Sequence, residues 1–76
     1  MWKEALLVWL KDFTPAVDLT DSTSQYSTLE IQNVLHQFTG EDISISELFV
    51  ELKSLNYVYT KTDDTRLEWI MKKITE

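Results

Sequence analysis

Cysteine is absent from this sequence, which excludes disulfide frameworks, thiol catalysis and thiolate zinc sites. Glycine occurs once, at Gly40, so a glycine-rich loop that cradles phosphate groups is excluded, and nucleotide hydrolysis with it. The apolar cluster at residues 5–10 is far too short to span a bilayer, and charged residues flank it closely. We therefore expect no signal peptide, no membrane contact and a cytoplasmic location.

Basic residues are also scarce. Seven Lys and Arg against thirteen Asp and Glu give a net charge of -6, which repels phosphate and disfavours sequence-independent binding of nucleic acid. Hydrophobic residues make up 43% of the chain, with three Trp, three Tyr and three Phe, which is far from the signature of disorder. We expect the 76 residues to fold as a single domain, residues 1–76.

A search for catalytic or metal-binding residues finds little. The one histidine, His36, has Gln32 and Gly40 at one helical turn's distance, and neither makes a convincing metal or acid–base partner. The adjacent carboxylates of Asp63 and Asp64 lack the further oxygen ligands of a calcium or magnesium site, so we interpret them as a solvated turn. We expect no enzyme activity, no cofactor, no metal and no small-molecule substrate.

Apolar residues recur at helical spacing in three segments. The first is residues 2–13, stopped by Pro15, because proline disfavours a helical conformation in the residue before it. The second is residues 27–39, which ends before Gly40, and the third is residues 44–56. The second and third open on a capping-box pattern, a serine followed three positions later by a glutamate: Ser27 with Glu30, and Ser44 with Glu47.

Beyond the third helix the period changes to that of strands. Residues 57–61 and 66–72 are rich in aromatic and β-branched side chains and are separated by a polar turn, so we expect a hairpin. A short strand at Tyr26, after a polar loop at residues 18–25, is also expected. Alternation along the second hairpin strand directs one set of side chains toward the helices, Leu67, Trp69 and Met71, and the other set outward, Arg66, Glu68 and Ile70.

The resulting order is helix, short strand, helix, helix, strand, strand. This order predicts an α+β, winged-helix-like fold with three helices followed by a β-hairpin. The rival architecture is a three-helix bundle with an extended tail, in which nothing obvious would cover the face that carries Trp69.

Most aromatic residues fall on the predicted apolar faces and are assigned to the core. For two of them, Trp2 and Trp9, the sequence leaves open whether they close this core or mark a surface that docks on another domain. The residues assigned to the core are Trp2, Trp9, Phe13, Phe38, Phe49 and Trp69.

Aromatic and basic residues mix only at the hairpin, where Tyr57 and Tyr59 lie close to Lys61 and Arg66. One or both tyrosines would project from it. Together with Lys53 of the third helix, these residues are the candidate contacts to nucleic acid or to a partner protein.

The third helix enters the major groove in winged helices that read DNA. Here its polar face carries two glutamates and one lysine, and the hairpin cations are offset by Asp63 and Asp64. The sequence therefore favours protein contact over autonomous DNA contact, and the fold alone decides neither. The polar face consists of Ser46, Glu47, Val50, Glu51, Lys53 and Ser54.

Five segments of the chain follow one family pattern: residues 26–31, 38–40, 43–48, 52–57 and 66–70. They contain the helix starts, the run Leu52-Lys53-Ser54-Leu55 before the hairpin, and the closing strand. In these segments the chain resembles the C-terminal end of the virulence-associated protein E group of Bacteroides-type bacteria and mobile elements. That group resembles phage-type primase-helicases, in which a P-loop ATPase precedes a small terminal domain.

The resemblance implies a non-catalytic accessory domain of a phage-type or mobile-element primase or helicase. Its partner would be the ATPase or primase part of the parent protein, with protein contacts or weak DNA contacts. The alternative is a stand-alone winged-helix protein of a phage or transposon that binds an operator or inhibits a host enzyme. A third class, in which the domain completes the active site of another subunit, has no support from these residues.

Overall fold

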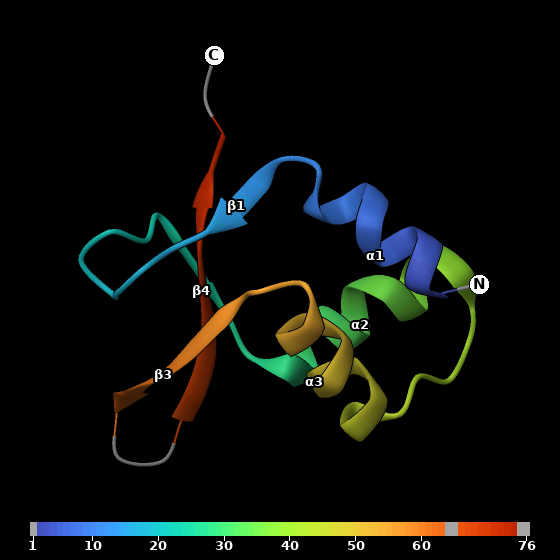
Figure 1. Ribbon diagram of the computed structural model, residues 1–76. Helices are drawn as coiled ribbons and strands as arrows, with labels where there is room; N and C mark the ends of the chain where they lie inside the picture. The colour runs from blue at the N-terminus through green and yellow to red at the C-terminus, as the bar shows by residue number, and fades with distance from the viewer. Residues whose placement is uncertain (1, 64–65, 75–76) are drawn as a thin grey trace.

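Three helices and four strands make up the part of the chain that the computed structural model describes, residues 2–63 and 66–74 (Figure 1). Their order is the predicted α+β winged-helix-like one, with one additional strand, β1, after the first helix. The elements are α1 (Trp2–Leu10), β1 (Phe13–Pro15), β2 (Ser24–Tyr26), α2 (Thr28–Thr39), α3 (Ile45–Ser54), β3 (Val58–Asp63) and β4 (Arg66–Lys73).

Strand β4 is the centre of an antiparallel sheet. Its residue Ile70 pairs with Gln25 of β2 and with Val58 of β3, so β2 and β3 lie along opposite edges of β4. The next residue, Met71, pairs with β2 and with Pro15 of β1, which places β1 on the same edge as β3. A strand paired on both edges is not a tail, so the rival bundle with an extended tail is wrong.

The ends of α2 and α3 are set by the predicted capping residues. The Ser27 hydroxyl accepts a hydrogen bond from the Glu30 backbone N–H at 3.1 Å, and the Glu30 carboxylate accepts one from the Ser27 N–H at 2.9 Å. The Ser44 hydroxyl caps α3 in the same way, by accepting from the backbone N–H three residues later. Gly40 after α2 and Asn56 after α3 adopt left-handed φ angles of 70° and 69°, which turn the chain out of each helix.

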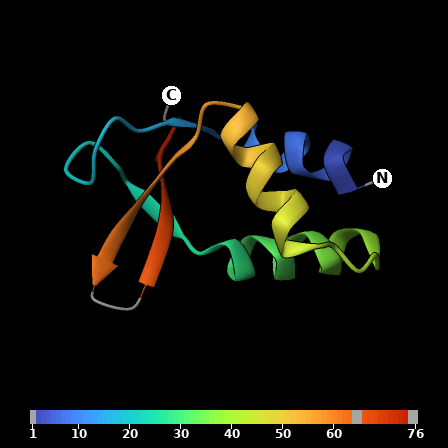
Figure 2. The same cartoon turned by 60° about the horizontal axis from the view of Figure 1, so that its bottom comes forward.

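The main core lies between the three helices and one face of β4. Both views show the helices gathered on one side of the sheet, with the β3–β4 hairpin reaching away from them (Figures 1 and 2). Each helix buries two leucine or isoleucine side chains here, and β4 adds two larger ones: Leu6, Leu10, Ile31, Leu35, Leu48, Leu52, Trp69 and Met71.

The other face of β4 is covered at one position. Ile70 and Ala16 are each 1% exposed, yet neither belongs to the main core. Residues 16–23 join β1 on one edge of β4 to β2 on the other, so this segment crosses the face toward which Ile70 points. Ile70 therefore lies on the face opposite Trp69 and Met71, as predicted, but it is buried there by a segment that the sequence did not predict to cover it. Leu67 was predicted to be buried and is 50% exposed, because it lies in the part of the hairpin that extends beyond the helices.

The first helix is shorter than predicted. It ends at Leu10, and Phe13 belongs to β1, whose residues pair with residues 71–73 of β4. Pro15 is tolerated there because β1 lies at an edge of the sheet, where a missing N–H costs no ladder bond. Phe38, assigned to the core from its helical spacing, is 71% exposed. Asp64, half of the predicted acidic turn, lies outside the described residues.

Candidate functional site

Two of the predicted contact residues meet beside the hairpin. The Lys53 ammonium lies 5.8 Å from the centroid of the Tyr59 ring. That ring is half-buried and packs against Phe49 and Trp69, with centroid distances of 5.0 and 5.2 Å. The Tyr59 ring is therefore in contact with two core aromatic rings and has a cation over it, which reduces the surface that a nucleobase could stack on.

Tyr57 does not project from the hairpin. It is 8% exposed, and its hydroxyl donates a hydrogen bond to the Phe13 carbonyl at 3.3 Å. Burial raises the pKa of the Tyr57 phenol above its ordinary value. Tyr57 is therefore a core residue and not a contact residue, contrary to the prediction.

The two cations nearest the turn of the hairpin, Lys61 and Arg66, are exposed. Lys61 lies two residues beyond Tyr59 on β3, so their side chains leave the same face of the strand. Arg66 pairs with Glu68 on its own strand, with 3.7 Å between Nη2 and Oε2. The positive charge at the turn end of the hairpin thus comes from Lys61 and a partly neutralised Arg66. Lys72 and Lys73 lie at the other end of β4, where the Lys72 ammonium is 3.3 Å from the Asp21 carboxylate.

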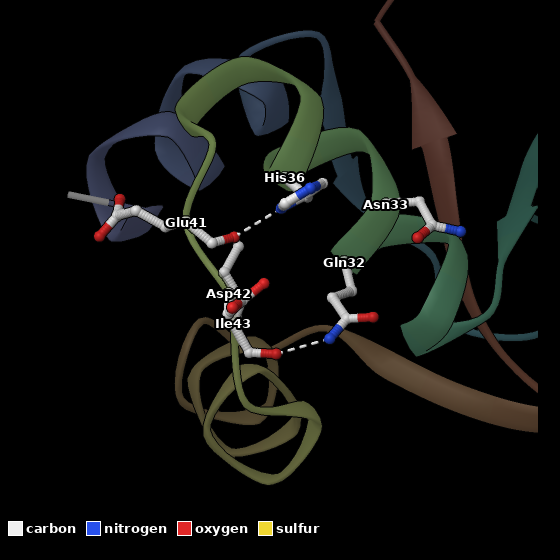
Figure 3. A pocket seen from close by; sticks show the side chains of 6 residues that line it. All are labelled: Gln32, Asn33, His36, Glu41, Asp42 and Ile43. Atoms are coloured by element: carbon white, nitrogen blue, oxygen red, sulfur yellow. Dashed lines mark hydrogen bonds between the residues drawn. The ribbon is translucent and has the colours of Figure 1, made fainter.

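A polar hollow of about 180 Å³ lies where α2 meets the loop before α3 (Figure 3). The Gln32 amide donates to the Ile43 carbonyl at 2.6 Å, and His36 Nδ1 lies 2.9 Å from the Glu41 carbonyl. A carbonyl can only accept, so Nδ1 carries the proton. These bonds hold the loop against α2, and the part of the chain described here contains no group of three or more metal-ligating side chains.

An apolar hollow of about 370 Å³ lies between α1 and the end of α2, and we call it the α1–α2 hollow. Its most exposed apolar members are Phe38 and Val8, at 71% and 62%. Trp9 contributes a half-buried ring that packs against Phe13 and Tyr26, with centroid distances of 5.1 and 5.2 Å. Trp9 therefore packs against the core and also lines this hollow. The lining residues are Ala5, Val8, Trp9, Asp12 and Phe38.

A larger hollow of about 490 Å³ lies between the first turn of α1 and the exposed face of α3, and we call it the α1–α3 hollow. Two of its lining residues offer apolar surface: Trp2, which is half-buried, and Val50, which is 65% exposed. The Lys3 ammonium stands 3.9 Å from the Glu51 carboxylate and 5.8 Å from the Trp2 ring centroid. The lining residues are Trp2, Lys3, Ser46, Glu47, Val50 and Glu51.

The sequence analysis identified the residues that α3 contributes to this hollow, as the polar face of the third helix. It did not identify the residues that α1 contributes. Trp2 and Lys3 are far from α3 in the chain, and only the packing of α1 brings them to it. The spacing of apolar residues in α1 places Trp2 on the inner stripe, and the structure shows it packed against the core. It also lines this surface hollow.

The longest helix among the described residues has 12 residues, against about 20 for a bilayer crossing, and none of the described helices is a candidate to traverse a membrane. Comparisons of this chain with protein-family models, with curated proteins and with solved structures gave no match.

Proposed function

We propose that this chain is a non-catalytic, protein-docking module of winged-helix-like fold that works in the cytoplasm. The observation that carries the proposal is the chemistry of the exposed face of α3, the helix that reads DNA in winged-helix proteins that bind it. That face presents Glu47, Val50 and Glu51 at the α1–α3 hollow.

Electrostatics argues against DNA as the main ligand. DNA binding draws most of its affinity from cations that displace counterions from phosphates. On α3 the one cation is Lys53, which is engaged with the Tyr59 ring, and Lys3 beside α3 is paired with Glu51. The chain as a whole carries a net charge of -6. An acidic helix that also exposes valine is better suited to a protein partner.

The resemblance to the virulence-associated protein E group suggests what kind of larger protein this domain belongs to. We propose that the domain is an accessory part of a phage-type or mobile-element primase or helicase. In that setting it holds the ATPase or primase part of its parent on a template or on a partner, and any contact of its own with DNA is weak. The parental gene tests this part: a Walker loop encoded upstream of this domain supports it, whereas a free-standing reading frame for these residues alone would refute it.

A second candidate is a stand-alone DNA-binding regulator. The observation in its favour is the line of Lys53, Tyr59 and Lys61 beside the hairpin, together with Arg66. A winged-helix hairpin touches phosphate or the minor groove in DNA complexes, and the exposed cations Lys61 and Arg66 near the hairpin turn support such a contact.

An NMR titration separates the two candidates. The amide resonances of the chain are followed while short single-stranded or double-stranded DNA is added at low salt, and again at higher salt. Protein docking predicts no saturable shifts. Shifts confined to α3 and to Tyr59, Lys61 and Arg66 that weaken with salt would establish a DNA-binding module. The variant Lys61→Glu should then abolish them, while the matched surface variant Lys11→Glu, in the turn after α1, should not.

A further inference from the structure

The α1–α3 hollow already contains one cation from its own chain. The Lys3 ammonium lies between the face of an indole and a carboxylate, the two kinds of group that bind lysine and arginine side chains in proteins. The contact is loose, because the Glu51 distance is 3.9 Å and the Lys3 side chain keeps 53% of its surface exposed. The hollow therefore has the chemistry of a cation-binding surface that is only partly satisfied.

A second carboxylate at the hollow has no cation of its own. Glu47 is exposed on α3 one turn before Glu51, and within residues 2–63 and 66–74 its carboxylate forms no ion pair. Val50 lines the same hollow as these acids and Trp2, and its side chain, 65% exposed, offers apolar surface. An acid next to apolar surface matches a side chain with a long aliphatic stem and a charged head.

We propose that the α1–α3 hollow docks a basic segment of a partner protein, with an arginine or lysine side chain inserted between Trp2 and Glu47. The proposal rests on the proposed protein-docking function and names its surface and the chemistry of its partner. The aliphatic stem of the partner's side chain lies on Val50, and its charged head contacts the Glu47 carboxylate. Arginine fits best, because its planar guanidinium can stack on the indole while it donates two hydrogen bonds to a carboxylate.

The α1–α2 hollow is the other apolar surface on which a partner segment could dock. It serves as a matched control for the α1–α3 hollow. It exposes Val8 to almost the same extent as Val50 is exposed, 62% against 65%. It has a single acid among its lining residues, Asp12, and no ammonium lies in it among the residues that line it. Its walls are almost entirely apolar, whereas the α1–α3 hollow places two carboxylates and an indole together, a combination that favours a cation.

The test uses the whole 76-residue chain and a synthetic amphipathic peptide, acetylated and amidated, with arginine on one face and leucine on the other. A second peptide has glutamate in place of arginine. Binding is measured by calorimetry and by NMR shifts. The arginine peptide should bind with shifts centred on residues 2–3 and 46–51, and the glutamate peptide should not bind. Glu47→Gln and Val50→Ser should each weaken binding by about tenfold. The controls Asp12→Asn and Val8→Ser change the same groups at the α1–α2 hollow and should leave affinity unchanged.

Each alternative outcome refutes the proposal in a recognisable way. Equal weakening by Glu47→Gln and Asp12→Asn would show that the peptide responds only to net charge. Loss of binding in Val8→Ser, with Val50→Ser unaffected, would move the site to the α1–α2 hollow. Self-association that Val50→Ser abolishes would make a second copy the occupant. Absence of binding would refute the docking of a basic segment but leave protein docking standing, because that function fails only when the DNA titration succeeds.

Discussion

The hydrogen bond between Trp69 and Thr28 offers a sharp test of how this small core is held together. Trp69 is 1% exposed, and its indole N–H donates to the Thr28 hydroxyl at 2.8 Å. Thr28 is the first residue of α2, and Trp69 lies in the central strand, so the bond ties a helix to the sheet. Replacing Thr28 with valine keeps the branched shape and removes the acceptor.

The expected loss of stability follows from the unpaired indole N–H that the substitution leaves in the core. In Thr28→Val the indole N–H stays buried with no acceptor, which costs about 1 to 3 kcal/mol of unfolding free energy. For a domain of this size each kcal/mol lowers the melting temperature by roughly 4 to 8 °C. Helix propensity contributes little, because threonine and valine rank close together. The control Thr28→Ser keeps the hydroxyl and should lose much less.

Urea unfolding followed by circular dichroism measures these free energies, and a double-mutant cycle isolates the bond. In a Trp69→Phe background there is no indole N–H to leave unsatisfied, so Thr28→Val should cost far less than it does in the native chain. We expect a coupling energy of about 1 kcal/mol or more between the two positions. Equal costs in both backgrounds, or a Thr28→Ser variant as unstable as Thr28→Val, would show that the bond does not stabilise the fold.

Two further predictions concern a cap and a buried phenol. Ser27→Ala removes the hydroxyl of the α2 capping box and should cost about 1 kcal/mol in urea unfolding, whereas Ser54→Ala, which removes an exposed hydroxyl bonded to the Glu51 carbonyl, should cost little. Tyr57 has a raised pKa in the folded state because of burial, so its contribution to stability is fully present below the unfolded pKa of about 10 and is lost as the pH rises through the folded pKa. Unfolding free energies measured across that alkaline range should fall more steeply for the native chain than for Tyr57→Phe, and parallel slopes would contradict the burial argument.

Local signals in the sequence were sufficient for the second and third helices. The Ser27 and Glu30 side chains satisfy each other's backbone amides within one turn, and Gly40 and Asn56 adopt left-handed angles that few other residues accept. These effects depend on residues a few positions apart, so the sequence alone predicts them. The hairpin was predictable for a similar reason, since its two strands are close neighbours in the chain.

The elements that the sequence missed depend on distant pairing. Residues 13–15 follow a helical stripe and contain a proline, and they become a strand only because β4 presents a free edge to them at residues 71–73. Ile70 is buried for the same kind of reason, since the segment over it connects two strands on opposite edges of β4. Helical spacing likewise predicted that Phe38 points into the core. The spacing carries no information on how far the contact between α1 and α2 extends, and Phe38 lies at its margin with 71% of its surface exposed.

The candidate site shows why charge has to be weighed together with shape. On sequence alone, Glu47 and Glu51 were evidence against one partner, because two acids on the third helix repel phosphate. Val50 was already assigned to this face, and the fold adds the Trp2 indole beside the same acids, with the Lys3 ammonium near both the indole and Glu51. The features that disfavour a nucleic acid then favour a basic protein segment. The same carboxylates that repel the phosphates of a nucleic acid can attract the cations of a basic protein segment, and Glu47 and Glu51 of α3 are the residues on which both effects depend.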